Sequence, residues 1–164
     1  MFLYELFGGG DVRHELFEIM QQTMLSTKRL YGKRLEPYGL TYAQYQVLTV
    51  IAEHEGLTAK DLLVYIDSDK ATLSGVLKRL EANHLIKRLR DDVDRRKQRI
   101  HCETAAVEMI AQFNKESDRL EKTLLKGLRG RELRLCRDVL RHIESRVLEK
   151  INEPTEQQRK TMVK

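Results

Sequence analysis

The pattern of apolar and polar positions predicts four helices in the first half of the chain. Apolar residues recur every three or four positions over 11–35, after Asp11, a residue type that caps helices. Thr41 and Thr58 each begin another such segment, and each is followed three residues later by a side chain that completes a capping box. A fourth segment, 69–83, carries a single apolar stripe. The last two segments are joined by a short polar turn, which is typical of a helix-turn-helix.

The character of the sequence changes after this turn-linked pair. Segments 85–90 and 98–102 have the length and composition of strands, and they flank a charged loop. They predict a β-hairpin, the wing of a winged helix. Leu57 is expected to form a short strand of its own.

Two further helices are predicted after the hairpin, over about 104–126 and about 131–151, with a glycine-marked bend between them. The second helix carries more apolar surface on one face than so small a core could cover, so a second copy of the chain is the economical cover. That face consists of Cys136, Val139, Leu140, Ile143, Val147 and Ile151. We therefore expect a mainly α fold with a small β wing, assembled as a homodimer.

Charge is concentrated in the hairpin. The whole chain carries a formal net charge of +5, which permits a polyanionic partner only if the excess is localised. Between Lys87 and Arg99, seven basic residues stand against three aspartates. A basic wing directly after a helix-turn-helix favours a nucleic-acid partner.

The sequence lacks the motifs of disulfide-rich, metal-binding, membrane and enzymatic proteins. Cys102 and Cys136 are the two cysteines, and they lack the spacing of a disulfide framework or a zinc cage, which fits the cytoplasm. The five histidines show no metal-ligand spacing. No signal peptide, membrane span, phosphate-binding glycine loop or nucleophile elbow is present. We expect neither enzymatic activity nor a cofactor or metal.

The predicted helix over 69–83 presents a face that is small and polar early and basic later. Small residues near the start of a helix allow close approach to base edges in the major groove, and later cations can meet phosphates. A solvated helix face is also polar, so this helix alone leaves that alternative open. The residues expected to contact DNA here are Ser68, Lys70, Ala71, Thr72, Gly75, Lys78 and Arg79.

The charged loop of the hairpin supplies a second set of candidate contacts. Arg96 is the candidate for insertion into a narrow minor groove, where a planar guanidinium is well suited. Asp94 is expected either to orient Arg96 by a charge-assisted hydrogen bond or to form an ordinary surface ion pair. Phosphate neutralisation is expected from Lys87, Arg88, Arg95 and Lys97.

The order and spacing of these motifs resemble the multiple-antibiotic-resistance regulator (MarR) family. The resemblance is carried by GLTYAQYQVL at 39–48, GLTAKDL at 56–62, DKATL at 69–73, LE at 80–81, LIKR at 85–88 and DRR at 94–96. It implies an intertwined helical homodimer with a winged helix-turn-helix, in most cases a bacterial or archaeal repressor. It also implies that 69–83 reads the major groove, that Arg96 reaches the minor groove, and that the partner is double-stranded DNA with a pseudo-palindromic site.

Two positions depart from the family's pattern. His84 stands where a glycine is common, so it or Asn83 must adopt a left-handed backbone. After the hairpin, the capping threonine of the next helix is displaced, or the cap moves to Thr104.

The resemblance further implies release of DNA by a small-molecule effector bound between the winged domain and the dimerisation helices. The candidate lining residues are Met20, Met24, Tyr31, Tyr45 and Phe113, although plain core packing is the favoured interpretation for each. Cys102 and Cys136 are both expected to be small buried hydrophobes, and a redox- or metal-responsive regulator remains an alternative. A winged helix used as a protein-interaction module is the other alternative, which the basic wing disfavours.

These interpretations divide the chain into four parts. Residues 1–38 form an N-terminal segment and first helix for dimerisation, and 39–103 form the winged helix-turn-helix DNA-binding domain. Residues 104–151 form the C-terminal dimerisation helices, and the polar tail 152–164 is expected to be disordered.

Overall fold

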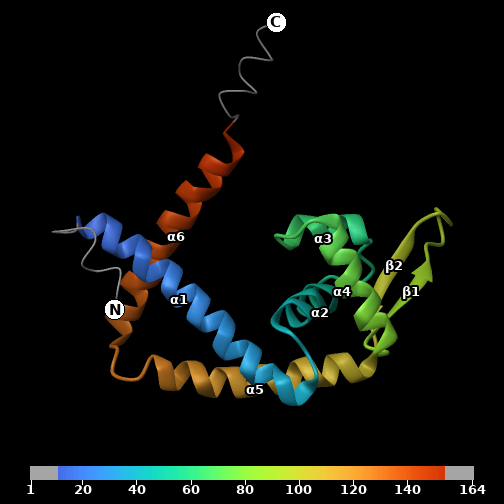
Figure 1. Ribbon diagram of the computed structural model, residues 1–164, viewed down its shortest axis with the longest axis horizontal. Coiled ribbons are helices and arrows are strands. Elements are labelled where there is room, and N and C mark those ends of the chain that lie inside the picture. The colour runs from blue at the N-terminus through green and yellow to red at the C-terminus, as the bar shows by residue number, and fades with distance from the viewer. Residues whose placement is uncertain (1–10, 154–164) are drawn as a thin grey trace, which may run out of the picture. The chain divides into compact units, whose positions relative to one another are not determined.

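The computed structural model describes residues 11–153, and Figure 1 shows the arrangement of its helices and strands. The expected disorder of the tail therefore falls, from residue 154 onward, outside the described residues. Contacts between residues divide the chain into two compact units, with the boundary between Ser117 and Asp118, inside the helix α5. Each unit is described by itself below.

The first unit holds the helix-turn-helix and the hairpin. Its elements are α1 (Val12–Leu35), the 3-10 helix η1 (Glu36–Tyr38), α2 (Tyr42–Glu53), α3 (Ala59–Tyr65), α4 (Lys70–Ala82), β1 (Ile86–Arg90), β2 (Gln98–Cys102) and the start of α5 (Thr104–Leu124). The second unit holds the end of α5 and the helix α6 (Gly130–Asn152). The predicted fold class, mainly α with a small β wing, is confirmed.

The predicted helix caps set the starts of the helices in the first unit. The side chain of Asp11 accepts a hydrogen bond from a backbone N–H in the first turn of α1. Thr41 and Thr58 each form a complete capping box, at the starts of α2 and α3. These bonds satisfy N–H groups that have no partner inside the helix, and so they fix where each helix begins.

The start of α5 differs from the cap that the sequence suggested. Thr104 is the first residue of the helix itself, and the carbonyl oxygen of Glu103 accepts the first helical hydrogen bonds, from Ala106 and Val107. The backbone N–H of Glu103 in turn donates to Leu85, at a distance of 2.9 Å. This bond ties the start of α5 to the beginning of the hairpin. Of the two alternatives, the cap at Thr104 is wrong, because Thr104 already lies inside the helix, and the displaced capping threonine remains.

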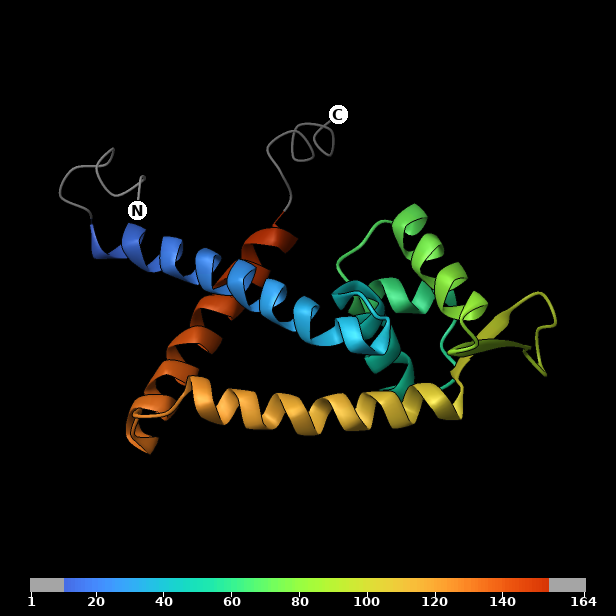
Figure 2. The same ribbon diagram turned by 60° about the horizontal axis from the view of Figure 1, so that its bottom comes forward.

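The hairpin is antiparallel, with Ile86 opposite Cys102 and Arg90 opposite Gln98. Leu57 forms an isolated bridge with Ile100, which confirms the short strand predicted there. Figure 2 shows the hairpin projecting from the helices, with its loop at the far end. His84 adopts the predicted left-handed conformation, with φ of 54°, in the turn that leads from α4 into β1.

A single apolar core holds the helix-turn-helix and the hairpin together. Apolar side chains from α2, α3, α4, β2 and α5 meet in it, and the largest of those that are almost fully buried are Phe113, Leu35, Leu48, Ile51, Leu62, Leu77, Leu80, Ile100 and Val47. Because α4 and β2 both pack against α2, α4 and the hairpin that carries the wing loop share one support.

The helix α6 of the second unit buries none of its residues within the single chain. Its predicted apolar face is largely exposed, including Val139, Leu140 and Val147 at 42–43%. Cys136, expected to be a buried hydrophobe, is also exposed, so that expectation is wrong for the described residues. Among the described helices, none is both long and apolar enough to cross a membrane.

Candidate nucleic-acid interface

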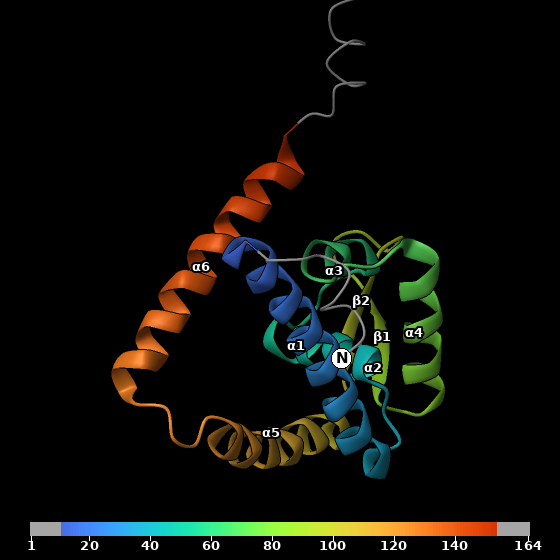
Figure 3. The ribbon, with the colours of Figure 1, turned by 60° about the vertical axis from the view of Figure 1, so that its left-hand side comes forward.

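The helix α4 has one buried side and one exposed side. Leu73, Leu77 and Leu80 face the core and are at most 2% exposed. On the other side, the described chain leaves Lys70, Ala71, Thr72, Lys78 and Arg79 exposed, with Ser68 and Gly75 half-buried. Figure 3 shows α4 at the edge of its unit, with one flank facing no neighbouring element of that unit. The predicted contact residues of this helix are thus brought together on one accessible face.

The start of α4 is organised by the carboxylate of Asp69. It accepts hydrogen bonds from the backbone N–H groups of Ala71 and Thr72, at 2.8 and 2.9 Å, and from the Thr72 hydroxyl at 2.6 Å. The hydroxyl bond is the largest cause of a lowered pKa for Asp69. Because the hydroxyl hydrogen of Thr72 serves Asp69, this residue offers its methyl group and oxygen lone pairs to a groove.

The wing loop exposes two arginines. Arg95 and Arg96 are both exposed, and within 11–153 neither guanidinium meets a carboxylate. Asp94 accepts from the backbone N–H of Arg96 at 3.1 Å and lies 3.9 Å from the ammonium of Lys97. The hypothesis that Asp94 orients the Arg96 side chain was therefore wrong, because its contact is to the backbone. The Arg96 guanidinium extends from the loop without that restraint.

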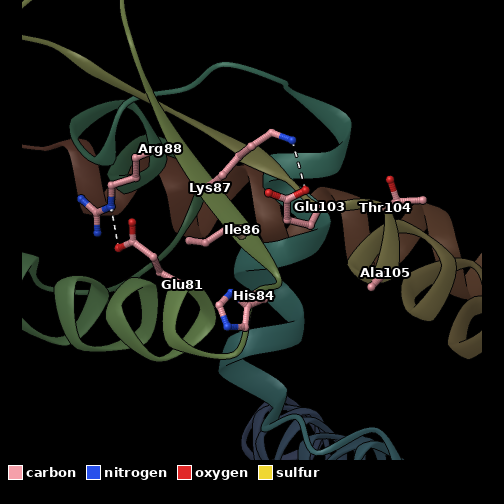
Figure 4. Close-up of a pocket in the computed structure, with 8 residues that line it drawn as sticks. All are labelled: Glu81, His84, Ile86, Lys87, Arg88, Glu103, Thr104 and Ala105. Atoms are coloured by element: carbon pink, nitrogen blue, oxygen red, sulfur yellow. Dashed lines mark hydrogen bonds and ion pairs between the residues drawn. The ribbon is translucent and has the colours of Figure 1, made fainter.

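Two predicted phosphate ligands at the base of the wing already have acidic partners. Nζ of Lys87 lies 3.1 Å from Oε2 of Glu103, and Nε of Arg88 lies 3.1 Å from Oε2 of Glu81 on α4. Figure 4 shows these pairs on opposite sides of β1, in a surface pocket that His84 also lines. Binding a phosphate here requires each cation to leave or share its carboxylate, which weakens the case for Lys87 and Arg88 as DNA contacts.

The sequence interpretation missed the residues that organise the wing loop. Asp91, only 5% exposed, accepts hydrogen bonds from the backbone N–H groups of Val93 and Asp94 and from the Arg99 guanidinium. These bonds, the two backbone ones first, lower its pKa from 3.8 to about 2. In the sequence pattern, Asp91 and Arg99 contribute only to the charge balance of segment 87–99. An aspartate directly after a strand, two and three residues before loop N–H groups, is a signal that could have identified the turn.

The effector candidates form a packed aromatic cluster only in part. Phe113 is 2% exposed, and its ring meets those of Tyr31, Tyr38 and Tyr45 edge to face, with centroids 4.7–5.9 Å apart. The hydroxyl of Tyr45 donates to Asn114 on α5 at 2.7 Å. Met20 and Met24 lie earlier on α1, outside this cluster. Three of the five candidates are thus brought together, by contacts that core packing explains.

Cysteine and metal chemistry have weak support in the first unit. The Cys102 thiol is buried and lies 3.6 Å from the carbonyl oxygen of Leu48. Burial, and secondarily the charge of Glu55, raises its pKa to about 11, so the thiol stays protonated and unreactive at neutral pH. Within the described chain, no group of three or more histidine, cysteine, aspartate or glutamate side chains is placed to hold a metal ion.

Part of the chain is similar to known transcriptional regulators. Residues 38–97 match a family model described as MarR family. The chain is 28% identical over 111 residues to the HTH-type transcriptional regulator MgrA of Staphylococcus aureus, covering 67% of this chain and 76% of that protein. It is 44% identical over 68 residues to the HTH-type transcriptional regulator TtmR of Methylorubrum extorquens, covering 42% and 35%.

A solved structure shows a similar fold. A crystal structure of the MepR–DNA complex of S. aureus has a TM-score of 0.66 and 25% identity, covering 80% of this chain and 94% of that one. The predicted winged helix-turn-helix is confirmed by these comparisons and by the two-stranded sheet. Over residues 38–97 this chain is similar to the MarR family, and its fold is similar to that of MepR.

Proposed function

We propose that this chain is a transcription regulator that binds double-stranded DNA as a homodimer and acts as a repressor released by a small-molecule effector. Two of its relatives are named as transcriptional regulators, and MepR was solved in complex with DNA. The proposed location is the cytoplasm, where that DNA lies in a bacterial or archaeal cell. No enzymatic step is part of this function.

One observation carries the proposal. The exposed face of α4 and the wing arginines without acidic partners belong to one unit and are held by one core. A major groove admits a helix such as α4, and a guanidinium suits a narrow minor groove. We therefore propose α4 as the base-reading element, with Thr72 near the bases, and Arg96 as the minor-groove contact.

The structure refines which cations are expected to meet phosphates. Lys78 and Arg79 on α4 and Arg95 on the wing have no acidic partner within the described chain, whereas Lys87, Arg88 and Lys97 have one. An ion pair lowers the gain from neutralising a phosphate, because the carboxylate loses its partner. The first three are therefore the stronger phosphate candidates.

The homodimer is supported by apolar surface that each unit leaves uncovered. In the second unit this surface lies on α6, and in the first unit it lies on α1, where Phe17, Ile19 and Leu25 are 49–56% exposed. Patches of this kind are typical of subunit interfaces. A two-fold dimer would read a pseudo-palindromic site, with half-sites about one helical turn, roughly 10 bp, apart.

The proposed effector site is the aromatic cluster around Phe113. The aromatic cluster around Phe113 lies where α1, α2 and α5 meet, and its tyrosine hydroxyls reach polar groups of α5. A ligand that separates these rings would displace α5 from the winged helix. An aromatic molecule is the chemical class that fits such a cluster.

Selection of genomic DNA tests the proposed function. Random genomic fragments are mixed with the purified full chain, and those retained are sequenced. We expect enrichment of a common two-fold-related motif. Retention of fragments without any common motif would favour a non-specific architectural protein, and retention of none would favour the protein-interaction module.

A further inference from the structure

The side chain of Arg99 joins the wing to the turn between α2 and α3. Its Nε donates to Oδ2 of Asp91, and its Nη1 donates to the carbonyl oxygen of Gly56, 2.7 Å away. Gly56 has a φ of +78°, and a Cβ built on it would lie 3.5 Å from Cδ of Arg99. The arginine therefore packs directly on this turn as well as bonding to it.

Asp91 carries the connection into the wing loop. Its Oδ1 accepts from the backbone N–H groups of Val93 and Asp94, at 2.9 and 2.7 Å, while its Oδ2 serves Arg99. Both carboxylate oxygens are thus occupied by contacts that hold the loop. The loop held in this way is the one that presents Arg95 and Arg96.

The charge of Arg99 also acts on a second carboxylate, that of Asp61. Hydrogen bonds from Thr58 are the main reason for the lowered pKa of Asp61 on α3, and the charge of Arg99 lowers it further. Arg99 already bonds to two acceptors of the protein itself, Asp91 and the carbonyl oxygen of Gly56, while 47% of its side chain is exposed. Arg99 donates two of its five N–H groups to these acceptors, and a move toward a phosphate would stretch or break those bonds.

We propose that Arg99 is a positioning residue: together with Asp91 it fixes the wing loop relative to the helix-turn-helix, and it does not itself contact DNA. This inference rests on the proposed DNA-binding function. A winged helix must place one element in the major groove and another in the minor groove at the same time. A small change in the angle between the wing and α4 would therefore break contacts in both grooves.

The competing interpretation counts Arg99 as another phosphate ligand of the basic wing. The two interpretations predict opposite signs for Asp91→Asn. If only charge mattered, removing a carboxylate near the phosphates would tighten binding. If Asp91 and Arg99 position the loop, the same substitution weakens specific binding.

A double-mutant cycle on the full chain separates these interpretations. The probe is a labelled duplex carrying the motif recovered by genomic selection. We expect Asp91→Asn and Arg99→Gln each to weaken binding by about tenfold, the cost of one lost specific contact, and the double variant to be no weaker than either. Arg99→Lys should restore little, because one ammonium lacks the planar fork that reaches both acceptors.

Arg90→Gln is the matched control, because it removes the same charge from the neighbouring strand without breaking this connection. Its effect should add to that of Asp91→Asn on a logarithmic scale. Tighter binding by Asp91→Asn, or additive effects of Asp91→Asn and Arg99→Gln, would overturn the proposal.

Amide hydrogen exchange tests the connection without DNA. In Arg99→Gln, the amides of Val93, Asp94 and Lys97 should exchange about tenfold faster than in the wild type, while amides of α4 keep their rates. Unchanged loop exchange would overturn the proposal even if affinity fell. If the wild type bound every duplex equally, the proposed function would be wrong. The exchange rates would still show whether Arg99 holds the wing loop, because that experiment contains no DNA.

Discussion

At the level of single residues, aspartates do as much as arginines to shape the interface. Asp69 fixes the start of α4 and the orientation of the Thr72 hydroxyl, and Asp91 fixes the wing loop. Both act as acceptors for backbone N–H groups, which a basic residue cannot do. In the proposed complex, the local excess of positive charge would attract DNA, while the acidic residues fix the geometry of the elements that meet it.

The Asp91 carboxylate should make stability depend on pH in the acid range. Its pKa is about 2 in the folded chain against an ordinary 3.8, so its contribution is fully present above the unfolded value and is lost as pH falls through the folded one. We expect the wild type to be more stable than Asp91→Asn near pH 5, and the difference to shrink toward pH 2. Urea unfolding at several pH values measures it. A difference independent of pH would contradict the role given to this carboxylate.

Arg96→Ala should lose affinity mainly for sites with narrow, A·T-rich flanks, by about 1–3 kcal/mol per half-site. Arg96→Lys should rescue little, because an ammonium is more strongly hydrated. Arg95→Ala provides the comparison and should weaken all duplexes to a similar extent. Unchanged affinity of Arg96→Ala for such a site at physiological salt would transfer the minor-groove role to Arg95.

At the level of elements, α4 separates stability from recognition on its two faces. Its apolar stripe belongs to the core, and its opposite face is free of neighbours in the described chain. Adjacent residues of this helix therefore serve different purposes, and substitutions at neighbouring positions should have separable effects.

Leu77→Ala should destabilise the fold by about 2–5 kcal/mol, because Leu77 is 1% exposed and its removal leaves a cavity. Lys78→Ala, at the next position, should change stability by no more than about 0.5 kcal/mol. It should instead weaken binding to all duplexes and make the dependence of log affinity on log salt shallower by about two units for a dimer. Thermal unfolding and salt titrations measure the pair. An unchanged salt slope for Lys78→Ala would remove this residue from the interface.

The elements that could be predicted from sequence are those built from short-range interactions. The capping boxes at Thr41 and Thr58 join residues three apart, and the stripe of α4 follows helical periodicity. The contact of Arg99 with Gly56 spans 43 residues, and the pairs of Lys87 and Arg88 also depend on how the hairpin folds back. These contacts join residues that are far apart in the sequence, so a local sequence pattern cannot predict them.

At the level of the whole molecule, the described residues leave an apolar helix face uncovered. The helix α6 buries none of its side chains, and Cys136 was expected to be buried but is exposed. Both observations have the same explanation if a second copy covers this face. The sequence pattern predicted an apolar face that the described chain leaves exposed, and its burial by a second copy is part of the proposal.

Leu140→Asp should dissociate or unfold the homodimer, because it places a charge at an interface without a counter-charge. Arg141→Glu, at an exposed neighbouring position, is the comparison and should leave assembly intact. Sedimentation at micromolar concentration measures the oligomeric state. A wild type that sediments as a stable folded monomer would contradict the proposed assembly.

Competition binding tests the central claim most directly. The full chain is titrated with a duplex carrying the selected two-fold site, against a duplex of the same composition with its half-sites scrambled, at physiological salt. The account predicts one dimer per duplex and a preference for the intact site of about 10³-fold or more. Equal affinity for the two duplexes would contradict the claim that this chain is a sequence-specific regulator.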